Sequence, residues 1–209
     1  MSGIQTLLKY LPAQSHDYVV FVVKTYPAHV HISSQRNTKL GDFRPSADGR
    51  LHRISVNHNL NPYAFLITLI HEYAHLLNWN KFKNKVKPHG SEWKHEFKSL
   101  MQPLMNEHVF PQDLLKALEK YMSNPAASSC ADKSLVLALR SFDQVQKHYL
   151  CDLEEDTVFR ISTGRMFIRK EKRRKFYTCI ELHSGKKYLV NELAEVEVLE
   201  KHFNGVKIF

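Results

Sequence analysis

Three ionisable residues with the spacing His-Glu-x-x-His stand in an otherwise apolar stretch: His71, Glu72 and His75. The apolar residues around them recur every three or four positions, which predicts an amphipathic helix, and they are Phe65, Leu66, Leu69, Ile70, Tyr73, Leu76 and Leu77. On a helix, His71 and His75 lie one turn apart on the same face, so both imidazoles can reach one metal ion. Glu72 lies beside them, where its carboxylate can act as the general base of a hydrolysis. Because burying such groups costs free energy unless they have partners, the pattern favours a zinc site over two histidines at the edge of a core.

The position of a third ligand distinguishes the classes of zinc peptidase. The metzincin pattern requires a glycine and a histidine at positions that are occupied here by Asn78 and Lys81, so this class is excluded. A thermolysin-like site would take a glutamate further along the chain, and Glu92 and Glu96 are the candidates. His89 is the stronger candidate because of the residues that flank it.

His89 lies between Pro88 and Gly90, which predicts a corner in the chain. Pro88 prevents a preceding helix from continuing, Gly90 permits a tight turn, and Ser91 is expected to cap a new helix. His89 would then face the first helix from the side. His95 lies further along the new helix, and we expect it not to be a ligand.

The sequence resembles the SprT/Spartan family of zinc metallopeptidases. The segments that carry the resemblance are His71-Glu72-x-x-His75, His89-Gly90-x-x-Trp93-Lys94, Lys39-Leu40-Gly41 and Arg53-Ile54-Ser55-Val56-Asn57. The resemblance implies that His71, His75 and His89 bind one catalytic zinc ion. It also implies that Glu72 is the general base and that the substrates are proteins bound or crosslinked to DNA.

The amino-acid composition is that of an ordinary globular protein with more basic than acidic residues. The chain has 209 residues, 43% of them hydrophobic, and a formal net charge of +9, which favours polyanionic partners. The three cysteines do not have the spacing of a disulfide-bonded protein, so we expect reduced thiols. The longest apolar run, residues 18–23, is too short to span a bilayer. We therefore expect a cytoplasmic protein, associated with the nucleoid if it binds DNA, and no membrane partner.

The expected fold is α+β, with a zincin-like metallopeptidase domain over residues 1–142 and a small all-β domain over residues 143–209. In the first domain, a small antiparallel sheet flanks the active-site helix, which begins at Asn61 and Pro62. Residues 18–23 form either a buried strand or a helix segment, which periodicity cannot separate, and the family resemblance favours the helix. The other expected elements are strands at 29–33 and 53–57, a helix at 110–121, a linker at 124–130, a short apolar segment at 135–139, and strands at 157–161, 166–168, 176–180 and 187–190.

The C-terminal region departs from the zinc ribbon that many members of the resembled family carry. Cys151 and Cys179 have each lost the second cysteine of a Cys-x-x-Cys pair, because Glu154 and Leu182 stand in its place. Since structural zinc requires four good ligands, the pattern favours a metal-free β unit with two cysteines over a second zinc site.

The same region has the densest positive charge in the chain. Its predicted nucleic-acid-binding residues are Arg169, Lys170, Lys172, Arg173, Arg174 and Lys175, and aromatic residues are interleaved with them. Such a hairpin can follow a phosphate backbone and stack unpaired bases, so we expect binding to single- or double-stranded DNA without sequence specificity. The alternative is a solvated basic hairpin.

The sequence is consistent with three functions. The first is a zinc-dependent endopeptidase acting on DNA-associated proteins. The alternatives are a non-catalytic nucleic-acid-binding protein with a structural zinc ion, and a peptidase with no DNA role.

Overall fold

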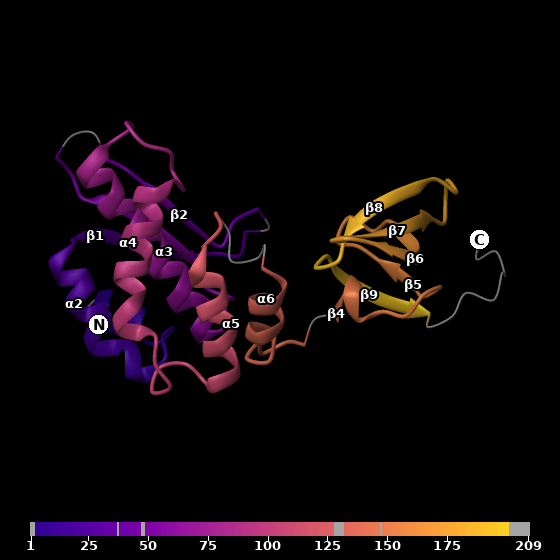
Figure 1. Cartoon of the computed structure of the whole chain (residues 1–209), viewed down its shortest axis with the longest axis horizontal. Coiled ribbons are helices and arrows are strands. Elements are labelled where there is room, and N and C mark those ends of the chain that lie inside the picture. Colours follow the sequence, from indigo (N-terminus) through magenta and orange to yellow (C-terminus); the bar gives the residue numbers. More distant parts are fainter. Residues whose placement is uncertain (1–2, 37, 47–48, 128–131, 147, 201–209) are drawn as a thin grey trace. The chain divides into compact units, whose positions relative to one another are not determined.

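The computed structural model describes residues 3–36, 38–46, 49–127, 132–146 and 148–200 (Figure 1). The chain forms two compact units, Met1–Gln144 and Val145–Phe209. The predicted linker at 124–130 lies partly outside the described residues.

The N-terminal unit begins with two helices, α1 (Gly3–Leu8) and α2 (His16–Thr25), joined by the 3-10 turn η1 (Ala13–Ser15). The α2 helix confirms the helix predicted at residues 18–23, although β-branched composition favours a strand there. Val19 and Val22, three positions apart, are both buried, so packing of one helical face outweighs the local propensity.

A three-stranded sheet follows, made of β1 (Ala28–Ser33), β2 (Gly41–Arg44) and β3 (His52–Asn57), in the spatial order β1-β3-β2. The β2 and β3 strands are antiparallel, but β1 pairs with β3 in the parallel direction. The expectation of an antiparallel sheet was therefore wrong. Because β2 occupies the far side of β3, the chain crosses from β1 past β3 and returns through the β2–β3 hairpin.

The longest helix of the unit is α3 (Pro62–Phe82), which contains the His-Glu-x-x-His segment. It begins as predicted: Asn61 accepts a hydrogen bond from the Ala64 N–H at 2.9 Å, and Pro62 occupies the first turn. Its apolar side chains pack against β2, β3 and the following helix, so α3 forms the centre of the unit. None of the helices in the described part of the chain combines the length and the apolar character that a membrane crossing requires.

The unit is completed by α4 (Ser91–Met101), η2 (Gln102–Leu104), α5 (Gln112–Ser123) and α6 (Lys133–Arg140). The helix predicted at residues 110–121 is confirmed by α5, and the apolar segment at residues 135–139 is helical and joins the core. Ser91 is the first residue of α4 rather than its cap, because Gly90 occupies the cap position without a side-chain hydrogen bond. The cap prediction for Ser91 was wrong by one position.

The C-terminal unit is a six-stranded sheet in the order β4-β9-β5-β6-β7-β8. Its elements are β4 (His148–Tyr149), η4 (Leu150–Asp152), β5 (Val158–Arg160), β6 (Met166–Arg173), β7 (Phe176–Glu181), β8 (Lys187–Asn191) and β9 (Glu195–Glu200). Four strands match the prediction, whereas β4 and β9 were not predicted. The β9 strand returns to pair with β5 and β4, and Phe159, Phe167 and Tyr177 lie in the core of this unit.

Candidate metal centre

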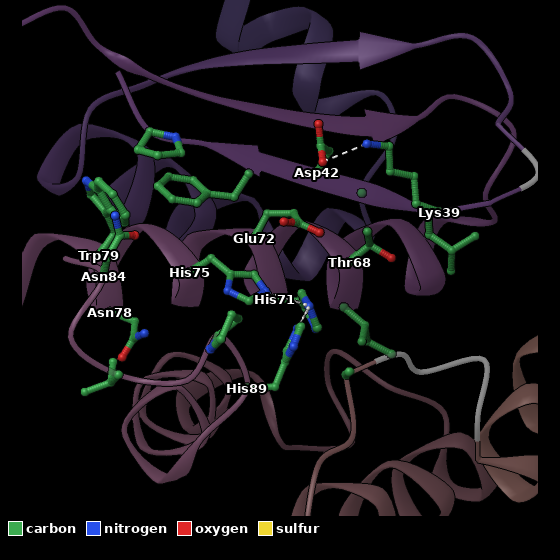
Figure 2. Close-up of a pocket in the computed structure, with 18 of the residues that line it drawn as sticks. Lys39, Asp42, Thr68, His71, Glu72, His75, Asn78, Trp79, Asn84 and His89 are labelled. Carbon is green, nitrogen blue, oxygen red and sulfur yellow. Dashed lines mark hydrogen bonds and ion pairs between the residues drawn. The ribbon is translucent and has the colours of Figure 1, made fainter. Parts of the chain in front are cut away.

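The imidazoles of His71, His75 and His89 converge in the N-terminal unit. The Nε2 atom of His71 lies 3.2 Å from that of His75 and 3.4 Å from that of His89. Figure 2 shows the imidazole rings of His71 and His75, both on α3, and the ring of His89 turned toward one another. Among the described residues, these three form the one group of histidine, cysteine and carboxylate side chains arranged to hold a metal ion.

Their spacing fits a tetrahedral zinc ion. Zn–N bonds of about 2.0–2.1 Å separate two nitrogen ligands of a tetrahedral ion by about 3.3–3.4 Å, which agrees with both measured distances. Burial, and the neighbouring imidazoles, lower the pKa of His71 to about 2. The same causes lower the pKa of His75 to about 3, and burial lowers the pKa of His89. All three rings are therefore neutral at pH 7, which is the form that binds metal.

Two local features bring the third ring to the other two. The helical period of α3 places His71 and His75 on one face. The segment from Lys87 to Gly90 turns sharply, with the Gly90 N–H donating to the Lys87 carbonyl at 3.0 Å. This turn presents His89 to α3 before α4 begins, as the proline and glycine on either side of it predict.

Trp93, in the first turn of α4, contacts all three imidazoles. Its ring centroid lies 4.6 Å from that of His71, 5.3 Å from that of His75 and 4.8 Å from that of His89. Trp93 is fully buried and stacks on Phe97, so it is held in place by the core. The indole thus supports the three rings in one arrangement, which limits their rotation without contributing a ligand.

Glu72 lies between α3 and the sheet, and its carboxylate is buried (Figure 2). Burial, and to a smaller extent the charge of Asp42, raise the pKa of Glu72 to about 8, against the opposing influence of Arg36 and Lys39. The nearby Phe43 backbone N–H also favours the charged form of Glu72 and lowers its pKa. A cation bound by the three histidines would favour the charged carboxylate and lower this pKa.

The three histidines and Glu72 line a cavity of about 540 Å³. One wall is formed by residues 38–43 at the start of β2, and the other by Trp79 and the segment that leads to His89. Apolar side chains such as Phe43, Trp79 and Val86 alternate in these walls with charged ones. The volume lies within the range of about 300–1,000 Å³ that is typical of ligand-binding clefts.

The six predicted nucleic-acid-binding residues lie on β6 and in the β6–β7 turn of the other unit. Three of them have partners on other segments of that unit. Arg169 stacks on Tyr177 at 4.1 Å, Lys170 pairs with Asp156, and Lys172 Nζ lies 2.8 Å from Glu192 Oε2.

The other three predicted residues lie at the end of the hairpin. Arg173 approaches Glu171 at 3.9 Å, and Arg174 and Lys175 are exposed in the turn. The exposed charge therefore concentrates at the hairpin tip rather than along the whole of β6. In the described part of the chain, Cys151 and Cys179 form no disulfide bond with each other, and neither belongs to a candidate metal group.

Comparison with known proteins identifies relatives of the N-terminal part of the chain. The model of the SprT-like family matches residues 13–113, which include α2, the sheet, α3 and α4. Relatives named Protein SprT include one from Cronobacter sakazakii, 34% identical over 97 residues, which are 45% of this chain and 57% of the relative. One from Salmonella arizonae is 35% identical over 88 residues (41% and 52%), and one from Salmonella newport is 30% identical over 123 residues (57% and 69%).

The chain therefore belongs to the SprT-like family. It spans little more than half the length of the first two relatives. No solved structure gives a significant match. The C-terminal unit lies beyond the residues that the family model matches.

Two features of the site cannot be predicted from the sequence. Trp93 belongs to the segment that carries the family resemblance, but its position against all three imidazoles depends on how α4 packs on α3. The approach of Gly41 and Phe43 to Glu72 has no signal in the order of residues, which does not show which strand will lie against the glutamate.

Proposed function

We propose that this protein is a zinc-dependent endopeptidase. The observation that carries the proposal is the convergence of three neutral imidazoles, with the Nε2 atoms of His75 and His89 at 3.2 and 3.4 Å from that of His71, in a cavity of about 540 Å³ that the buried carboxylate of Glu72 also lines. A structural zinc site uses four protein ligands, whereas a catalytic site uses three and keeps one position open.

Residues of the chain have distinct roles in the proposed reaction. His71, His75 and His89 would hold the ion, which would supply a Lewis acid to polarise a substrate carbonyl and to acidify water. Glu72 accepts a proton from the attacking water and delivers it to the leaving amine. The outer edge of β2, which borders the cavity, pairs with the extended backbone of the substrate.

We further propose that the substrates are proteins associated with or crosslinked to DNA. The net charge of +9 and the exposed Arg174 and Lys175 support this proposal, since a basic hairpin tip attracts phosphates. The ion pairs of Lys170 and Lys172 reduce the net charge that β6 offers, so the tip is expected to contribute most of the binding.

The Glu72→Gln variant tests the peptidase proposal. It removes the proton acceptor but keeps the imidazoles, so it should retain one zinc ion per chain and lose at least about 100-fold of the cleavage rate. The assay uses an unfolded protein substrate with zinc, with and without DNA. Equal cleavage by wild type and variant would contradict the proposal and leave a metal-binding protein without this catalytic activity.

The DNA proposal is tested separately by the salt dependence of binding. Replacing Arg174 and Lys175 with serine should reduce the slope of log K against log salt by about 1.4–1.8, while replacing Lys116 and Lys120 of α5 should leave it unchanged. A slope that is equal in all three proteins would exclude the hairpin tip as the DNA contact.

A further inference from the structure

The first residue of β2, Gly41, lies directly against the side chain of Glu72. A Cβ atom on Gly41 would overlap Glu72 Oε1 and would lie 2.8 Å from Glu72 Cγ and 2.7 Å from Thr68 Cγ2. Real Cβ atoms essentially never approach other atoms this closely. The backbone of Gly41 is outside the left-handed region, so an alanine could adopt its dihedral angles. Position 41 therefore requires glycine because glycine has no side chain, and not because of its conformational freedom.

Two residues further along β2, the backbone N–H of Phe43 lies close enough to the Glu72 carboxylate to lower its pKa. Because β2 is at the edge of the sheet, alternate backbone groups on its outer side face no further strand among the described residues. One of these groups approaches a side chain of α3 here. Gly41 and Phe43 thus act on the same carboxylate from one strand, and the first permits the approach that the second needs.

We propose that β2 is the positioning element for Glu72. The bare Cα of Gly41 lets the strand approach α3 closely enough for the Phe43 amide to fix the carboxylate beside the three histidines. A glutamate side chain has several rotamers, and selecting one of them before the substrate arrives removes an orientational cost from the reaction. Gly41 and Phe43 are positioning residues, which act on the reaction only through Glu72. The effect on rate rests on the proposed peptidase function, whereas the contact itself does not.

Amide exchange in the full-length, zinc-loaded protein tests the contact without any activity. The Phe43 amide should exchange slowly in the wild type and at least about 10-fold faster in Glu72→Ala, while the amides of β3 stay within about twofold. Gly41→Ala should accelerate Phe43 in the same way, since its methyl group forces the strand and the carboxylate apart. If exchange at Phe43 is the same in wild type and Glu72→Ala, the proposed hydrogen bond is absent and the inference is overturned, even where Gly41→Ala does not fold.

Kinetics then test the consequence of the contact. Gly41→Ala should lower kcat by about 100-fold, with KM within about threefold and one zinc ion retained. Gly3→Ala is the matched control, because a Cβ atom on Gly3 would meet nothing within 4 Å. Its kcat should equal that of the wild type.

A double-mutant cycle separates positioning from general damage. In a Glu72→Asp background the carboxylate is shorter and already displaced, so Gly41→Ala should cost less than about 10-fold there. An equal loss in both backgrounds would show that Gly41→Ala acts through the fold and would overturn the positioning role. If the wild type itself cleaves no protein, the proposed function fails, and amide exchange still decides whether β2 holds Glu72.

Discussion

Replacing His89 with alanine should weaken zinc binding strongly while leaving the fold intact. His89 is the one imidazole of the three that comes from outside α3, and its Nε2 lies 3.4 Å from that of His71. It is only partly buried, and it is presented by a turn rather than by the core. The substitution therefore removes one ligand without opening a large cavity.

The size of the effect follows from the number of ligands. Protein zinc sites bind with about 10–16 kcal/mol, which is roughly 3–4 kcal/mol for each of four coordination positions, or two to three powers of ten in Kd. With zinc at about 1,000 times the wild-type Kd, the ion stabilises the fold by about 4 kcal/mol. A 100-fold weaker Kd reduces this stabilisation to about 1.4 kcal/mol. For a unit of this size the difference corresponds to a Tm that is about 5–10 °C lower.

Competition with a chromophoric chelator measures the Kd, and thermal unfolding with and without zinc measures the stabilisation. His95→Ala is the control, because His95 is exposed on α4 and lies outside the histidine cluster. Its Kd and its Tm shift should match those of the wild type. The coordination reasoning is refuted if His89→Ala binds zinc within about threefold of the wild type, or if His95→Ala loses as much affinity.

Three further predictions concern stability. The folded pKa values of His71, about 2, and His75, about 3, lie below the unfolded value near 6.5, so the unfolded state binds more protons as pH falls. The free energy of unfolding of the metal-free protein, measured with urea, should therefore fall by up to about 1.4 kcal/mol per histidine for each pH unit below pH 6.5. A free energy of unfolding that does not change with pH in this range would contradict the burial of neutral rings. Lys83 follows the last residue of α3 and has φ 54° and ψ −130°, a backbone conformation that favours glycine. Lys83→Gly should therefore raise the free energy of unfolding by about 0.5–1 kcal/mol, whereas Lys85→Gly should not, because φ of Lys85 is not positive. Asn61 caps α3 and also donates to the Leu139 carbonyl, so Asn61→Ala should cost about 1–3 kcal/mol in chemical denaturation, and a loss below about 0.5 kcal/mol would count against the cap.

Much of α3 can be predicted because its signals are local. The apolar residues repeat with the helical period, and the Asn61-Pro62 pair marks the start of the helix, so the order of residues is enough to assign the two histidines and Glu72 to one helix. The turn at His89 can be predicted for a similar reason, since proline and glycine restrict the backbone wherever they occur.

Other features depend on contacts between distant segments and cannot be predicted in this way. The parallel pairing of β1 with β3 and the return of β9 to β5 are choices between strands that look alike in sequence. Clustered charge predicts that Lys170 and Lys172 face nucleic acid. Their partners, Asp156 and Glu192, come from elsewhere in the chain and meet them only in the folded sheet.

By itself, the sequence determined which chemical groups the protein brings to its site: three imidazoles, a carboxylate and the helix that spaces two of the rings. Helical period and turn chemistry act over a few residues, so they can be read in order along the chain. Only the tertiary structure decided that the third ring meets the other two over Trp93, and that β2 approaches α3 closely enough to hold Glu72. Those distances depend on how the core packs around α3, and packing joins residues that the order of the chain keeps apart.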